Sequence, residues 1–195
     1  MAAPTKLNFK IYQGSTFSEV LRWESDVKVY VPIANIVKTA PMVVTATAHG
    51  APANWRVKIS NVIGMKEANT SDYILATSVS ANTLTFNSIN ATTYTAYTAG
   101  SGILEYNQPV DLTDYTARMQ IREKVTSSTV IKELTTANGG ITIDNTNKTI
   151  SIYISAADTA LFTFKTAVYS LELVNGALVL PFIFGGITLD TEITR

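Results

Sequence analysis

Apolar and polar residues alternate along much of this chain with the period of two that marks a half-buried β-strand. The segment KLNFKIYQG (residues 6–14) places three large apolar side chains on one face and ends at a glycine. The segment YTARMQIREK (residues 115–124) continues the same alternation over a longer stretch. Both segments are therefore predicted to be strands with one face in a core.

Two other alternating stretches are interrupted by turn signals, which predicts β-hairpins. Residues 141–155 (ITIDNTNKTISIYIS) contain the polar turn 144–148, and residues 167–184 turn at Asn175 and Gly176. The second stretch includes the longest apolar run of the chain, ALVLPFIFGG. Because its proline interrupts a regular strand, this run is predicted to form two strand pieces.

One segment, SAADTALFTF (residues 155–164), has helical character. Ser155 is the expected N-cap, and Asp158 follows three residues later, as in a capping box. A helix of one or two turns needs packing against the rest of the fold to be stable. Four phenylalanines in this region and the last hairpin are expected to fill the core: Phe162, Phe164, Phe182 and Phe184.

The middle of the chain differs in composition from both ends. Residues 31–107 are rich in Thr, Ala, Asn and Tyr and poor in charge, and short β-runs alternate with turn clusters about every ten residues. This spacing is typical of a small barrel or sandwich. An unstructured loop of nearly eighty residues would be exceptional in a compact domain, whereas a folded insert only needs its two ends close together.

We therefore predict an all-β fold with two domains. Residues 1–30 and 108–195 would form a discontinuous, immunoglobulin-like sandwich with one short helix, used for docking and assembly. Residues 31–107 would form an inserted small β-barrel.

Composition narrows the classes of function. The chain has 15 basic and 15 acidic residues and a formal net charge of zero, whereas nucleic-acid-binding proteins usually carry a basic excess. Charged residues make up 15% of the chain, against about 25% in an average domain, so little repulsion opposes association. The absence of Cys excludes disulfides and thiolate metal sites. Without an apolar run of about 18 residues or a secretory-signal pattern, no membrane partner is expected.

The single histidine, His49, decides whether an enzyme is expected. Catalysis or metal binding would need partner groups, yet no carboxylate lies within seventeen residues of His49 on either side. The preceding TATA and the following Gly50 indicate a strand that runs into a turn. The acidic residues fall mostly in predicted turns or on polar strand faces, and no dinucleotide, phosphate-loop or nucleophile-elbow motif occurs. We predict no catalytic residue, no cofactor and no metal site.

Large side chains in or beside the loops of the predicted insert are the candidate partner contacts. They are Trp55, Met65, Tyr73, Tyr94 and Tyr97. Aromatic rings at such places can stack on sugars or pack against a partner protein. Packing in the core or at its rim is the alternative, and it is the more frequent role for these residue types.

Several segments at the two ends of the chain carry a family resemblance. They are KIYQGSTFSEVLRW (10–23), DLTDYTARMQIR (111–122), NGGITI (138–143), ISAADTALF (154–162), AVYSLEL (167–173) and the closing GGITLDTEITR. Together they resemble a β-sandwich domain of tailed-phage virion proteins, of which the N-terminal domain of phage upper baseplate proteins is one relative. The resemblance covers residues 5–30 and 108–195, which is more than half of the chain.

The predicted insert resembles a second module. The segments that carry this likeness are TATAHG (45–50), VKISNVIGM (57–65), ANTLTF (81–86) and YTAYTAGSG (94–102). They resemble a small β-barrel common in phage tail and virion proteins, which is similar to the first catalytic-cysteine half-domain of ubiquitin-activating enzymes. Because the chain has no Cys, this likeness implies a fold and no ubiquitin chemistry. The turn at residues 51–55 departs from the usual Gly- and Asp-rich sequence of the module.

These resemblances imply a structural virion protein of a tailed bacteriophage, located in the tail, baseplate or fibre-attachment region. It would act through protein–protein contacts in a symmetric assembly, with copies of itself and other virion proteins as partners. Its location would be the virion, assembled in the host cytoplasm. Two alternatives stay open: a capsid decoration or cement protein, and a receptor- or glycan-binding module, for which a glycan is the less favoured partner.

Overall fold

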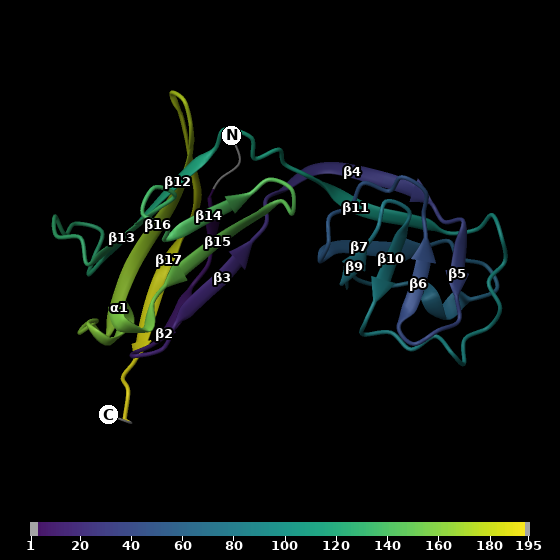
Figure 1. The fold of residues 1–195 in the computed structure, drawn as a ribbon, viewed down its shortest axis with the longest axis horizontal. Helices are drawn as coiled ribbons and strands as arrows, with labels where there is room; N and C mark the ends of the chain where they lie inside the picture. Colours follow the sequence, from purple (N-terminus) through teal and green to yellow (C-terminus); the bar gives the residue numbers. More distant parts are fainter. Residues whose placement is uncertain (1–3, 194–195) are drawn as a thin grey trace. The chain divides into compact units, whose positions relative to one another are not determined.

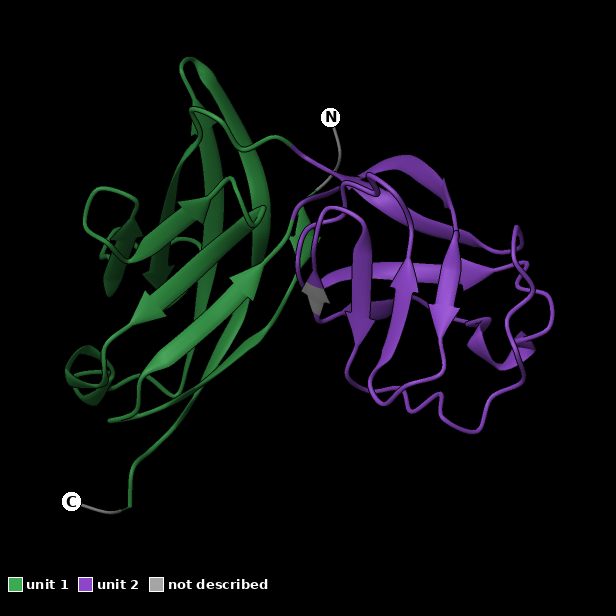
Figure 2. Ribbon diagram, turned by 45° about the vertical axis from the view of Figure 1, so that its right-hand side comes forward, with its two compact units in different colours: residues 1–22, 111–195 green, residues 23–110 purple. Residues whose placement is uncertain are grey.

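The structure, a computed structural model, describes residues 4–193, apart from the side chain of Ser78. Nearly all of its regular structure is β-strand, which confirms the all-β class. The chain divides into two compact units (Figure 2). We call residues 1–22 and 111–195 the sandwich unit, and residues 23–110 the inserted unit.

The unit boundaries lie at 22/23 and 110/111, several residues outside the predicted insert 31–107. The reason is an antiparallel pair of strands at the base of the inserted unit, β4 (Glu24–Pro32) and β11 (Ile103–Pro109). Beyond the pair, the amide of Val110 donates to the carbonyl of Trp23 at 3.0 Å. The inserted unit is therefore closed by its own first and last strands.

The sandwich unit contains a six-stranded and a three-stranded sheet. The larger sheet has the order β1-β17-β16-β12-β13, and β2 also pairs with β17. Its strands are β1 (Thr5–Lys6), β2 (Phe9–Tyr12), β12 (Thr116–Arg122), β13 (Lys132–Thr135), β16 (Thr166–Asn175) and β17 (Leu178–Asp190). The smaller sheet has the order β14-β15-β3, with β14 (Ile141–Asp144), β15 (Thr149–Ile154) and β3 (Phe17–Leu21).

The two sheets form two layers around a shared core, which confirms the sandwich-like arrangement (Figure 1). Phe9 from the larger sheet and Phe17 from the smaller one meet with ring centroids 5.3 Å apart, and Phe9 also stacks on Tyr169 at 4.8 Å. Strand β12 has the burial pattern expected for such a layer, since alternate side chains from Ala117 to Ile121 are buried. Period-two alternation therefore builds this core directly.

Both predicted hairpins are present, as β14–β15 and β16–β17. The predicted break in the second hairpin is wrong, because β17 is one continuous strand with a bulge. Leu171 pairs with Ile183 and Glu172 pairs with Pro181, so the residue between them is extra. A bulge tolerates a proline, because the ladder is already interrupted there. The tip of this hairpin extends beyond the other strands of the unit (Figure 1).

The predicted short helix is α1 (Ala156–Ala160), and Ser155 is its N-cap. The Ser155 hydroxyl oxygen accepts from the Asp158 amide at 3.1 Å, as a capping residue should. The helix is held to the unit by Thr159, whose buried hydroxyl donates to the carbonyl of Ser15 at 2.8 Å. No helix within residues 4–193 is long and apolar enough to cross a lipid bilayer.

The inserted unit consists of two four-stranded sheets, with the orders β4-β11-β7-β8 and β5-β6-β10-β9. The remaining strands are β5 (Asn35–Val37), β6 (Met42–Thr45), β7 (Trp55–Ser60), β8 (Ile74–Ala76), β9 (Ser78–Val79) and β10 (Thr83–Phe86), with one 3-10 turn, η1 (Lys66–Ala68). Their inner faces enclose a core that includes the largest buried side chain, Trp55.

These two sheets form the unit for which a small barrel was predicted. The chain passes from one sheet to the other at Ile33 and Ala34, whose amides donate to Gly102 and to Thr45 at 3.1 and 2.8 Å. It passes between them again at Thr77, whose amide donates to a carbonyl of β10 at 2.9 Å. Strands that bend at such corners connect the two sheets, but their ladders do not merge into one closed barrel in the described part of the chain.

Candidate functional site

Two of the five predicted partner contacts are core residues. Trp55 and Met65 are completely buried in the inserted unit. The indole N–H of Trp55 donates to the main-chain carbonyl of Asn107 at 2.8 Å, so its one polar atom is also satisfied inside the unit. The prediction of partner contact is therefore corrected for both residues, since neither offers a side chain to a partner.

The three tyrosines of that prediction are half-buried. Tyr94 packs against the core of the inserted unit. The hydroxyl of Tyr97 lies 2.8 Å from the carbonyl oxygen of Ile33 and 2.6 Å from that of Ser101, so it ties two connections together. Tyr94 and Tyr97 thus have structural roles that account for their positions, and Tyr73 alone belongs to a polar surface cluster.

The Tyr73 cluster joins three side chains of the inserted unit. The Tyr73 hydroxyl donates to the carboxylate of Glu105 and accepts from the ammonium of Lys28, which also lies 4.5 Å from the centre of the Tyr73 ring. The hydrogen bond from Tyr73, followed by the Lys28 charge, lowers the pKa of Glu105. Loss of water contact, followed by the bond to Glu105, raises the pKa of Tyr73. The cluster therefore keeps its carboxylate and ammonium charged at neutral pH.

His49 directly follows a turn at residues 47–48, close to the turn predicted from its neighbours, and its side chain is buried. Its Nδ1 accepts from the amide of Ala51 at 3.0 Å, and its main-chain carbonyl accepts from the hydroxyl of Tyr106. Because Nδ1 is an acceptor, the ring hydrogen is assigned to Nε2, which has no hydrogen-bond partner among the described residues. Among residues 4–193, no three His, Asp or Glu side chains are grouped so as to hold a metal ion.

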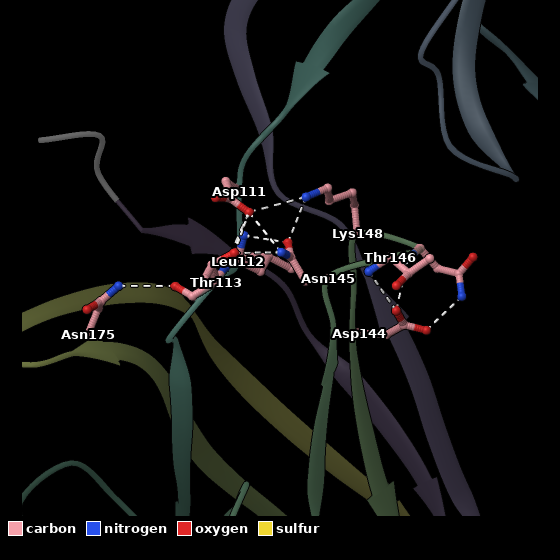
Figure 3. A network of polar contacts seen from close by, with 9 residues as sticks. Asp111, Leu112, Thr113, Asp144, Asn145, Thr146, Lys148 and Asn175 are labelled. Carbon is pink, nitrogen blue, oxygen red and sulfur yellow. Dashed lines mark hydrogen bonds and ion pairs between the residues drawn. The ribbon is translucent and has the colours of Figure 1, made fainter. Parts of the chain in front are cut away.

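A polar network fixes the point at which the chain re-enters the sandwich unit (Figure 3). Asn145, in the β14–β15 turn, accepts from the amide of Leu112 at 2.8 Å and donates to Asp111 at 2.9 Å and Thr113 at 2.8 Å. Lys148 donates to Asn145 at 2.7 Å and lies 3.3 Å from the Asp111 carboxylate. The hairpin turn therefore binds the first residues that follow the inserted unit.

The same network strongly changes the pKa of one carboxyl group, that of Asp111. The hydrogen bonds from Asn145, then from Thr113 and Lys148, lower the pKa of Asp111 to about 2. Asp111 is therefore charged throughout the physiological range. This arrangement has the features of a structural clamp, since each member is satisfied by another member of the same unit.

The outer face of the six-stranded sheet carries an apolar strip on β17. Val179 and Phe184 are each 41% exposed, although they lie on a regular strand. Their ladder partners Val174 and Ser170 alternate with buried leucines of β16, which places both side chains on the outer face. The expectation that Phe184 fills the sandwich is therefore wrong, whereas Phe162 is buried. We call Val179, Pro181 and Phe184 the β17 surface.

Polar pairs lie on the same face of the sheet, on β16 next to β17 and on β12 and β13 beyond it. Arg118 and Glu172 form an ion pair at 2.7 Å, and Gln120 donates to Glu133 at 2.8 Å. An apolar strip beside satisfied polar pairs resembles the centre and rim of a protein interface. Sequence reasoning missed this surface because it treated the apolar run 177–184 as core.

A scan against protein-family models finds no matching family, and a search of curated proteins finds no relative. The function is therefore argued from the chain's own surface together with the sequence resemblance.

Proposed function

We propose that this protein is a structural component of a tailed-phage virion, in the tail, baseplate or fibre-attachment region. It acts through contacts with copies of itself and with other virion proteins, and it performs no reaction. The phage assignment rests on the sequence resemblance of both units. The contact role rests on the exposed β17 surface.

The β17 surface suits a protein partner for energetic reasons. Fully burying a Val or Phe side chain stabilises by about 1.5–3 kcal/mol, and Val179 and Phe184 are both substantially exposed. A partner that covers them would gain part of this free energy. Hot spots of protein interfaces are built in this way, from a few apolar anchors surrounded by polar contacts.

The free edge of β17 favours a specific partner. Residues 178–181 pair with β16, whereas the pairings of β17 with β1 and β2 in the described structure begin at residue 183. Pro181 has no amide hydrogen to offer to an added strand, and prolines at edges oppose indiscriminate strand pairing. We therefore expect a partner that covers the outer face, and no open-ended addition of strands.

The first test locates the protein in virus particles. Gold-labelled antibody against this protein should mark the tail or its tip on intact particles, and mass spectrometry of purified particles should find it in a few copies per particle. Label spread over the head, with a high copy number, would support the decoration alternative. Absence from purified particles, in a lysate that contains the protein, would contradict a virion role.

The second test addresses the β17 surface itself. Val179→Asp and Phe184→Asp should each reduce incorporation into particles by about 30-fold, because a charge replaces an apolar anchor worth about 2 kcal/mol. Thr188→Asp is the matched control, since Thr188 is also exposed on β17 but lies outside the β17 surface. Equal incorporation of all three variants, with unchanged folding, would remove the β17 surface from the proposal.

A further inference from the structure

A surface hollow of about 280 Å³ lies in the sandwich unit. It is lined by three residues of β13, the connection at residues 138–140, and residues of β15 and α1. Small-molecule sites usually measure roughly 300–1,000 Å³. The hollow lies just below this range, which suits a single ring and not an extended chain.

One wall of the hollow is fixed by the side chain of Asn138. Its carbonyl oxygen accepts from the amides of Thr135 at 2.8 Å and Gly140 at 3.0 Å, and its NH₂ group donates to the carbonyl of Glu133 at 3.1 Å. Two of these bonds also give hydrogen-bond partners to backbone groups of β13, the Thr135 amide and the Glu133 carbonyl. The next residue, Gly139, has a φ of +75° and open space where a Cβ would stand. The wall is therefore preorganised, and its backbone is accessible to a ligand.

The hollow contains an ordered pair of opposite charges. The Lys132 ammonium lies 2.7 Å from one oxygen of Asp158, and the Ser155 hydroxyl donates to the other oxygen at 2.8 Å. The Lys132 bond, followed by the Ser155 bond, lowers the pKa of Asp158, so the carboxylate is charged at neutral pH. Each carboxylate oxygen keeps a free lone pair, and the ammonium keeps further hydrogens to donate. Two adjacent hydroxyl groups of a ligand match this pair, since one can donate to Asp158 and the other can accept from Lys132.

Tyr153 gives the hollow an aromatic surface. Its side chain is 49% exposed, whereas its neighbours Ile152 and Ile154 are buried, so it stands on the outer face of β15. An apolar ring face beside a polar pair is complementary to a pyranose, which has an apolar C–H face and a rim of hydroxyl groups. A simple anion fits less well, because the acidic residues Glu133 and Asp158 are both among those that line the hollow.

We propose that this hollow binds one pyranose residue of a carbohydrate. The sugar ring lies against Tyr153, and two adjacent hydroxyl groups bind Asp158 and Lys132. This differs from the glycan-binding alternative considered for the inserted unit, because the site lies in the sandwich unit and uses other residues. It also stands independently of the virion assignment.

The test is a titration of the full chain, observed through its amide NMR spectrum. The probes are the methyl glycosides of glucose, galactose, mannose and N-acetylglucosamine at millimolar concentrations, which suit the weak binding expected of a single ring. At least one probe should give saturable shifts at Gly139, Gly140, Tyr153 and Ser155. Tyr153→Ala should weaken binding by about ten-fold, since it removes the stacking surface.

A matched control is present in the same unit. Tyr12 is 55% exposed, and Lys10, which is paired with Asp190 at 2.7 Å, lies over its ring, so the same three residue types meet outside the hollow. Tyr12→Ala should therefore leave the titration unchanged. Tyr153→Phe should retain most of the binding, because the ring remains. Tyr153→Gln removes the ring but keeps a long polar side chain, so it repeats the test if the alanine variant disturbs the fold.

Three outcomes would overturn the proposal. The first is the absence of saturable shifts with all four glycosides. The second is equal weakening in the Tyr153 and Tyr12 variants, which would indicate unspecific contact with exposed rings. The third is displacement of the sugar-induced shifts by sodium phosphate at comparable concentration, which would identify an anion site at Lys132 instead.

Discussion

The two units of this protein build their cores in different ways. In the sandwich unit, nearly all buried apolar side chains alternate along strands, as in β12 and β16. In the inserted unit, a substantial part of the core comes from connections, including His49, Ala51, Met65 and Ala91. A core built by strand alternation follows from the sequence pattern, whereas a core built by connections depends on how each turn is held.

Side chains hold those turns in the inserted unit. Asn69 accepts from the amide of Val62 at 2.9 Å and donates to the carbonyls of Val62 and Lys66 at 3.2 and 3.0 Å. Ser101 accepts from the amide of Ile63 at 3.0 Å and donates to Thr98 at 2.7 Å. Such bonds replace a strand partner for each backbone group. We therefore expect the inserted unit to be more sensitive than the sandwich unit to polar substitutions in its turns.

The largest effect should come from Trp55→Ala. Removing a completely buried indole should lower the free energy of unfolding of the inserted unit by about 3–5 kcal/mol. Both tryptophans of the chain, Trp23 and Trp55, lie in this unit, so urea denaturation of the parent protein followed by tryptophan fluorescence reports on it alone. In the Trp55→Ala variant, the fluorescence of the remaining Trp23 gives the urea concentration at the midpoint of unfolding, which should be lower than in the parent protein.

The amide NMR spectrum of this variant shows separately whether the sandwich unit and the inserted unit are folded. Signals of the sandwich unit should keep their native positions when those of the inserted unit collapse. Loss of both sets at the same urea concentration would show that the two units unfold as one, and the comparison between them would then fail.

Gly185→Ala is the reciprocal change, in the sandwich unit. A Cβ at Gly185 would stand 1.9 Å from the main-chain carbonyl oxygen of Leu7, which also accepts from the Tyr169 hydroxyl at 2.7 Å. The N-terminal segment must move away, at a cost of about 3 kcal/mol. Hydrogen exchange of the Leu7 amide, which donates to Phe184 at 2.9 Å, should accelerate markedly. Gly139→Ala is the steric control because nothing lies within 4 Å of its added Cβ, although its φ of +75° adds some strain.

His49 offers an intermediate effect that isolates the contribution of one turn. His49→Ala removes the acceptor for the Ala51 amide and should destabilise the inserted unit by about 1–3 kcal/mol, because that amide is buried. His49→Asn should restore part of the loss, since an Asn side chain accepts from the amide two residues later in the same way. Equal stability of the two variants in thermal denaturation would show that packing of the ring, and not the hydrogen bond, determines the effect.

The smallest effect concerns Asp111 and depends on pH. Its pKa is lowered from 3.8 to about 2 in the folded protein, so its contribution to stability is present above pH 4 and is lost as the pH falls from 4 to 2. Asp111→Asn should therefore flatten the acid dependence of the stability of the sandwich unit between pH 4 and pH 2. Near pH 7 to 8 the variant should be less stable than the parent protein, because the contribution of the charged carboxylate is missing there. Acid titration of the two proteins, followed by the amide signals of the sandwich unit, measures the difference. Parallel acid curves would contradict the clamp described at the re-entry point.

Several elements of the fold follow from the sequence alone. The strand at residues 115–124, the two later hairpins and the Ser155 cap were all predicted, because alternation and capping are local signals. Strands β4 and β11 were not predicted. Val27, Val29 and Val31 do alternate with polar residues in β4, but the partner strand lies more than seventy residues away, and no local pattern specifies that pairing.

The candidate sites were less accessible to sequence reasoning. The sequence did contain a signal that Trp55 is buried, because Trp55, Val57 and Ile59 alternate along β7 and share its buried face. Met65 lies in an irregular connection, where no periodicity indicates burial. The hollow is lined by segments that are separate in the sequence and come together only in the folded protein, among them β13 and β15. No sequence motif therefore indicates it.

The hydrogen bond between Trp23 and Val110 has a consequence for how such a chain could evolve. Because the two ends of the inserted unit lie one hydrogen bond apart, the whole of residues 23–110 is topologically equivalent to a hairpin turn. A short turn could replace the unit without changing the course of any strand of the sandwich unit, and another domain with adjacent ends could take its place. The inserted unit therefore meets the geometric condition for domain exchange. Recombination at the junction of residues 22/23 and 110/111 could join different inserted domains to the same sandwich unit.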